Sequence, residues 1–349
     1  MRSGRSSSAN RPGRPASANR TRSVAFLAAL ACVLLAAVLL CLRAGSYDTP
    51  VAELIRGLFG RAADERINIV VQNNRLPRIL TAILAGAGLG VSGCVLQAIL
   101  RNPLASASTL GVSQGASFGA AFAIIAVGLG GAGGVGVPLF AFAGSMAVAL
   151  VILALSRLRQ ISPEAIVLSG VAISSMFTGA TTLLQYFADE VELQSLMFWT
   201  FGSLGSTDWA DVRVMAAVVA LACAYFYIHR WDYNALLSGA ETASSIGLNV
   251  RRLTLVNMIL CCFVASTIVS YIGLISFIGL IAPHMVRQVV GNNHVYLIPG
   301  SALAGAALLL LGDLFARMVV SPVILPIGAI TSFLGGPLFL YLLFRGRKR

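Results

Sequence analysis

The sequence predicts an all-α fold, a polytopic membrane bundle of about ten transmembrane helices, and three observations carry this prediction. Of the 349 residues, 57% are hydrophobic and only 11% are charged, which is typical of membrane proteins. The apolar residues gather in runs long enough to cross a bilayer as helices. Arginines stand beside these runs, so the net charge of +12 indicates orientation in a membrane rather than binding to nucleic acid.

The stretch around which the chain is organised is an uncharged run from Ile79 to Leu100. As a helix it measures about 33 Å at about 1.5 Å per residue, which is enough to span a bilayer. Gly86 and Gly90 lie four residues apart within it, a spacing that lets neighbouring helices approach closely. We expect the helix to end before Pro103, because proline lacks an N–H group and clashes with the preceding turn.

The remaining elements follow in chain order. Residues 1–22 contain almost nothing apolar and predict a disordered, basic cytoplasmic tail, which leaves 23–349 as the transmembrane domain. The apolar core of Val24–Leu42 is about 19 residues long, so we interpret it as a retained first span rather than a signal peptide. Further spans are predicted at Thr109–Leu129, Val135–Ser156, Ala165–Phe187, Val212–Ile228, Leu253–Ile275, Ile278–Val290, Val295–Met318 and Val323–Phe344. The run at Ile278–Val290 is short and contains Pro283, so a count of nine spans stays open.

Charge distribution predicts how the bundle is oriented. Ten alternating spans with a cytoplasmic N-terminus put 17 of the 25 basic residues and 3 of the 13 acidic residues on the inner side. This arginine excess predicts that both termini are cytoplasmic. The longest inner connection is 230–252, in which we expect one or two short helices, one beginning near Ser238 and broken at Gly247. It is either an amphipathic surface element or a docking element for a soluble partner.

Several functional classes are disfavoured by the residues that the chain carries. Its only lysine is Lys348, so a Walker A loop cannot be formed, and no catalytic, cofactor or metal-ligand spacing stands out. We therefore expect neither an enzyme nor a cofactor nor a metal site. An ion-coupled carrier would use ionisable groups within the membrane, for which Asp313 is the main candidate. A structural ion pair with Arg317, one turn further along, explains that residue equally well.

Seven motifs then appear in a fixed order: RLPR, QAILRNPLA, LGVSQGA, LSGAETASSIGLNVRRL, FIGLIAPHMVR, GDLFAR and LPIGAITSFLGGPLFLYLL. Over residues 25–345 the chain resembles the FecCD-type permeases of ABC importers for iron–siderophore complexes, haem and vitamin B12. The resemblance implies a vitamin B12 permease-like fold and import of an iron(III)–siderophore-type complex, with a corrinoid or haem as the alternative cargo.

The resemblance also implies partners in the plasma membrane of a prokaryote. They are a second permease subunit, identical or paralogous, two cytoplasmic ATP-binding subunits that hydrolyse ATP, and an extracytoplasmic substrate-binding protein. The pathway would lie between the two permease subunits, with a neutral and apolar wall. An ion-coupled secondary carrier and a non-transporting membrane scaffold are the alternatives from other classes.

Site residues follow from the same resemblance. It implies that Arg75, Arg78 and Arg317 receive acidic residues of the binding protein, since guanidinium forks pair bidentately with carboxylates. Anchoring to lipid headgroups is the alternative for these arginines. It further implies that Asn102 and Leu104 narrow the cytoplasmic exit, for which a simple helix-stop turn is the alternative.

The coupling segment of the family matches the inner connection. The residues that would contact the ATPases are Ala240, Glu241, Ala243, Ile246, Gly247 and Leu248. Two departures from the family pattern stand out. Ile324 replaces a glutamate before the LP motif, and Pro163 and Glu164 replace the small polar residues of a second inner constriction. We therefore assign no gate to Pro163 and Glu164.

Overall fold

The computed structural model describes residues 16–44, 50–129, 136–158, 163–320 and 323–346, and these residues form helices and connections without strands. The longer helices are α1 (Ala16–Arg43), α4 (Leu76–Ile99), α6 (Gly136–Leu158), α7 (Pro163–Phe187), α9 (Trp209–Ile228), α12 (Val250–Ile272), α14 (His294–Met318) and α15 (Ile327–Gly346). The shorter helices are α2 (Val51–Leu58), α3 (Glu65–Val70), α5 (Val112–Ala121), α8 (Glu190–Phe201), α10 (Arg230–Leu236), α11 (Ala240–Ser245) and α13 (Ile278–Val290). Two π-helical turns, η1 (Val71–Arg75) and η2 (Phe122–Ala126), extend α4 and α5.

The prediction of about ten apolar helices is confirmed. Within the described ranges, seven helices are long and apolar enough to cross a membrane, and three shorter apolar helices lie at Val112–Ala126, Ile278–Val290 and Ile327–Leu342. Their positions match the ten predicted runs. The run that left the count open forms α13, a helix of 13 residues with Pro283 inside it.

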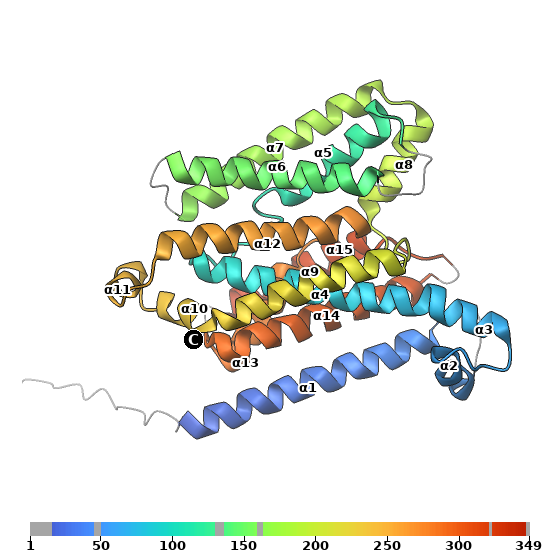
Figure 1. The fold of residues 1–349 in the computed structure, drawn as a ribbon, viewed down its shortest axis with the longest axis horizontal. Coiled ribbons are helices and arrows are strands. Elements are labelled where there is room, and N and C mark those ends of the chain that lie inside the picture. Colours follow the sequence, from blue (N-terminus) through green and yellow to red (C-terminus); the bar gives the residue numbers. More distant parts are fainter. Residues whose placement is uncertain (1–15, 45–49, 130–135, 159–162, 321–322, 347–349) are drawn as a thin grey trace, which may run out of the picture.

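Helix α4 lies at the centre of the bundle, packed against α14, α12, α13 and α9 (Figure 1). The glycines predicted to allow close packing do so, because a Cβ on Gly86 would overlap the backbone of Gly305 and one on Gly90 would overlap the carbonyl of Ser301. Gly93 meets Gly279 of α13 in the same way. The helix ends at Ile99, before the proline, as expected.

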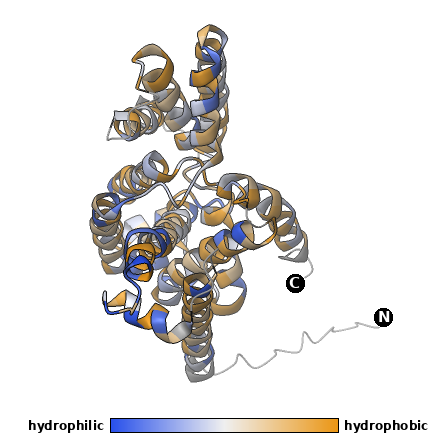
Figure 2. Cartoon of the chain, turned by 90° about the vertical axis from the view of Figure 1, so that its right-hand side faces the viewer, coloured by the Kyte–Doolittle hydropathy of each residue, from blue (hydrophilic) through white to orange (hydrophobic). Residues whose placement is uncertain are grey.

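The bundle has two distinct ends (Figure 1). At one end lie α2 and α3, which follow α1 and lead into α4; at the other lie α10 and α11. Helices α5, α6 and α7 pack on one another as a group beside the core, which Figure 2 shows at the top of the view. Large apolar side chains are exposed on the outer helices, among them Leu35 of α1, Leu168 of α7 and Phe333 of α15, as in a protein surrounded by lipid or by partner subunits.

Two sequence-based boundaries differ from the structure. Helix α1 begins at Ala16, so the part of the expected tail from residue 16 to residue 22 continues the first helix, and residues 1–15 lie outside the described residues. The first helix of the 230–252 connection is α10, and the second begins at Ala240 rather than Ser238, because Gly239 takes φ +104° at its N-cap. Helix α7 begins at Pro163, and the side chains of Pro163 and Glu164 lie outside the described residues.

Candidate functional site

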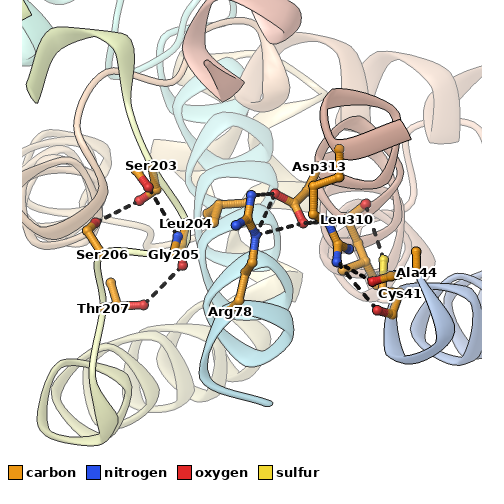
Figure 3. Close-up of polar contacts among 11 residues, drawn as sticks. Cys41, Ala44, Arg78, Ser203, Leu204, Gly205, Ser206, Thr207, Leu310 and Asp313 are labelled. Carbon is orange, nitrogen blue, oxygen red and sulfur yellow. Dashed lines mark hydrogen bonds and ion pairs between the residues drawn. The ribbon is translucent and has the colours of Figure 1, made fainter. Parts of the chain in front are cut away.

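A buried carboxylate at the α2–α3 end holds two arginines from different helices (Figure 3). Asp313 of α14 has a side chain only 1% exposed. Arg78 of α4 donates from Nε to both carboxylate oxygens, at 3.0 and 3.2 Å, and from Nη2 to Oδ1 at 2.8 Å. Arg317, one turn further along α14, brings Nε to 3.1 Å from Oδ2 as an ion pair without hydrogen-bond alignment. The expected ion pair between Asp313 and Arg317 is therefore present, and Arg78 joins it.

The end of α1 is tied to the same cluster. Arg317 donates from Nη1 to the carbonyl of Ala44 at 3.1 Å and lies 3.5 Å from that of Cys41, and Arg75 donates to the carbonyl of Leu42. These carbonyls belong to the last turn of α1, where a helix leaves its acceptors unpaired. Arginines from α14 and η1 thus satisfy carbonyls at the carboxyl end of α1.

The three arginines of this cluster are largely buried. Arg75 is 7% exposed, and the side chains of Arg78 and Arg317 are 13% and 12% exposed. Arg78 also lies against the α8–α9 connection, where a Cβ on Gly205 would come within 3.0 Å of its Nη1. The docking role implied by the resemblance therefore falls on guanidinium groups that already have partners within the chain.

The turn after α4 lies at the α10–α11 end. Asn102 accepts a hydrogen bond at its Oδ1 from the N–H of Leu104 at 2.9 Å, which closes a tight turn around the proline. The side chain of Leu104 is 42% exposed on this turn.

The segment Ala240–Leu248 projects from the same end. Ala243 is buried against the bundle, whereas Ile246 is 69% exposed and Glu241 is exposed beside it. Gly247 ends the helix with φ +92°, a conformation that glycine adopts without strain, as the sequence predicted. The segment thus presents an exposed apolar side chain on a short helix, which suits contact with a soluble protein.

Two hydrogen-bonded pairs, the first buried and the second partly buried, join α10 to the membrane helices. Tyr233 donates its hydroxyl to Oδ1 of Asn257 of α12 at 2.6 Å, and burial raises the pKa of Tyr233, so the hydroxyl stays a donor. Asn234 accepts at its Oδ1 from the backbone N–H of His294 at 2.8 Å and lies 2.9 Å from the Nδ1 of that residue, at the start of α14. These pairs were not predicted from the sequence, since nothing in the local pattern marks their partners.

The described residues offer no internal room for a bulky ligand at the best-formed cavity. That cavity lies between α4, α5, α12 and the start of α13, and it holds about 20 Å³, the size of a single water molecule. Within the described ranges, no three His, Cys, Asp or Glu side chains gather in a group that could hold a metal ion. A bulky solute does not fit this cavity.

The apolar helices of the described residues, seven of them long enough to cross a membrane, indicate a multi-pass membrane protein. The chain matches the model of the FecCD transport family over residues 33–345. It is 48% identical to an ABC transporter permease protein of Methanocaldococcus jannaschii over 87% of this chain and 90% of that protein. It is also 35% identical to the hemin transport system permease protein of Yersinia pestis, over 84% of this chain and 89% of that one.

A solved structure agrees with these relatives. A metal-chelate type ABC transporter, in an inward-facing conformation, superimposes with a TM-score of 0.81 and 32% identity, covering 91% of this chain and 98% of that chain. The chain belongs to the FecCD transport family.

Proposed function

We propose that the protein is the transmembrane permease subunit of an ABC importer for an iron(III)–siderophore-type complex. The observation that carries the proposal is the α10–α11 unit. It presents an exposed Ile246 to the solvent while Tyr233 and Asn234 bind it to α12 and α14. Such a unit can transmit a movement of a soluble partner to the membrane helices. The sequence has no lysine for a Walker A loop, so the energy would come from two ATP-binding subunits that contact Ala240–Leu248.

The charge distribution supports one orientation of the permease in the membrane. With the α10–α11 end in the cytoplasm, both termini are cytoplasmic and the arginine excess lies inside, as the positive-inside rule requires. The α2–α3 end then faces the outside. Its cluster holds three arginines against the single carboxylate of Asp313, a positive surplus that would attract the acidic surface of a substrate-binding protein.

The pathway is proposed to lie between this subunit and a second one, identical or paralogous. The water-sized cavity within the chain and the exposed apolar faces of α7 and α15 support a path formed with a partner. The exposed Leu104 would meet its counterpart at the cytoplasmic exit, with Asn102 fixing the turn that presents it.

The relatives support a bulky, preformed metal complex as the class of cargo, since one is a hemin permease and a matching structure is of a metal-chelate type transporter. Within that class we propose a complex of the iron(III)–siderophore type. A corrinoid or haem is the alternative cargo. An ion-coupled carrier is less favoured, because the side chain of Asp313, the main candidate for ion coupling, is already engaged in ion pairs with Arg78 and Arg317.

Uptake into vesicles that contain the permease, its ATPases and its binding protein tests this function. We expect uptake of a ferric siderophore to require ATP and to continue when an ionophore removes ion gradients. Uptake that stops with the ionophore and ignores ATP depletion would make the protein a secondary carrier. The ligand that raises the melting temperature of the binding protein identifies the cargo.

A further inference from the structure

The buried state of the arginine cluster points to a step that precedes docking. The side-on fork of Arg78, formed by Nε and Nη2, is fully occupied by Asp313. Arg317 and Arg75 are engaged with the end of α1. With side chains 13% and 12% exposed, Arg78 and Arg317 offer no free bidentate fork at the surface. An acidic partner therefore has to replace contacts that these arginines already make.

Spare hydrogen-bond donors remain in the cluster. Nε and Nη2 of Arg317 are buried without a hydrogen-bond partner, although Nε is paired by charge with Asp313. A buried donor left unpaired is costly, so Arg317 gains hydrogen bonds by donating to further acidic oxygens. Because one carboxylate is shared between two guanidinium groups, further carboxylates can compete for these arginines.

We propose that Asp313 pairs with Arg78 and Arg317 until the substrate-binding protein docks, and that acidic side chains of that protein then replace Asp313 at these arginines. The inference rests on the docking role proposed above and adds its mechanism. Before docking, Asp313 holds Arg78 of α4 and Arg317 of α14 in place, and Arg317 clamps the last turn of α1. When the arginines turn to the partner, the clamp on α1 is released, and the external end of the bundle loosens only in the docked complex.

The chain carries a natural reporter for this release. Cys41 lies in the last turn of α1, is fully buried, and places its Sγ 3.8 Å from the carbonyl oxygen of Leu310 on α14. Its own carbonyl lies 3.5 Å from Nη1 of Arg317. Release of Arg317 should uncover this thiol from the outside. The other cysteines of the described residues are the exposed Cys32, the half-buried Cys223 and the buried Cys94, Cys261 and Cys262.

The test labels the full transporter, reconstituted in nanodiscs, with a membrane-impermeant maleimide, with and without its substrate-binding protein. We expect the binding protein to raise the labelling rate of Cys41 about tenfold, within the range of typical coupling between sites. The variant Cys41→Ala assigns the signal, because it should abolish the increase.

Removal of the internal carboxylate gives the second arm. Asp313→Asn should bind the substrate-binding protein about tenfold more tightly at low salt and should label at Cys41 without it. Glu190→Gln, which removes an exposed acid from α8 at the same end, controls for the change in net charge and should alter neither result by more than about twofold. Asp313→Asn/Arg317→Gln restores the net charge of the cluster and should keep part of the gain, since Arg78 stays released.

The outcomes separate the two proposals. If the binding protein docks while labelling of Cys41 stays at its free rate, the exchange is wrong, even where Asp313→Asn fails to fold. If charge reversal of Arg75 and Arg78 to glutamate weakens docking but Asp313→Asn does not strengthen it, only the exchange falls. If that charge reversal leaves docking unchanged at low salt, the docking role is wrong and the exchange falls with it.

Discussion

Replacement of Gly86 by alanine tests whether the α4–α14 contact is as close as the structure has it. In a helix, alanine is favoured over glycine by about 0.5–1 kcal/mol. At this position, however, the new Cβ would overlap the carbonyl of Gly305 and the Cα of Ala306, which are backbone atoms that cannot rotate away. Overpacking of this kind costs about 1–3 kcal/mol. We expect a net loss of about 1–2 kcal/mol, a factor of roughly 5–30 in the folded-to-unfolded ratio.

The matched control is Gly179→Ala on α7. No atom lies within 4 Å of a Cβ added there, so only the helix preference remains and stability should rise slightly. The assay follows thermal unfolding of the full-length chain in detergent with a dye that reacts with newly exposed thiols, such as those of Cys94 and Cys261. Equal melting temperatures for Gly86→Ala and Gly179→Ala would refute the close contact and the central place of α4.

Three further outcomes follow from the other end of the bundle. Leu104→Ala should let loaded vesicles leak substrate without ATP, and Leu104→Cys should crosslink two permease subunits; if the thiol neither crosslinks nor responds to nucleotide, the turn is only structural. Gly247→Val should uncouple ATP hydrolysis from uptake while the chain stays folded, because φ +92° strains any other residue but a Cβ meets no neighbour. Tyr233→Phe should destabilise the chain by about 1–3 kcal/mol by leaving the buried Asn257 amide oxygen unpaired, and adding Asn257→Leu should recover most of that loss, as thermal unfolding can check; additive losses in the double variant would contradict this explanation.

Much of the architecture could be predicted because membrane spans are long and uniform in composition. The ten apolar runs, the stop before Pro103 and the small-residue contact at Gly86 and Gly90 all depend on local sequence. The separate helix α8 was missed, although a signal was present. Asp189 and Glu192 form a capping box at its start, a pattern that marks a helix N-terminus.

The burial of the arginines could not be predicted from local sequence. Arg78 and Asp313 are 235 residues apart, and their pairing depends on how α4 and α14 cross, which no pattern within either helix specifies. The pair Asp313–Arg317 was readable, because residues four apart share a helix face. The hydrogen bonds of Tyr233 with Asn257 and of Asn234 with His294 also join different helices, so they could be seen only in the folded chain.

A crosslink between the α11 segment and an ATP-binding subunit tests most directly the proposal that this chain is a permease driven by an ATPase. Ile246→Cys replaces an exposed apolar side chain at the end of α11 with a thiol and leaves the buried Ala243 unchanged. In the reconstituted transporter, we expect this thiol to crosslink to a cysteine in the groove of the ATP-binding subunit, and the crosslink to block ATP-driven uptake until it is reduced. Full uptake by the crosslinked transporter, or no crosslink at any position of the ATPase groove, would contradict the proposal that this chain is driven through α11.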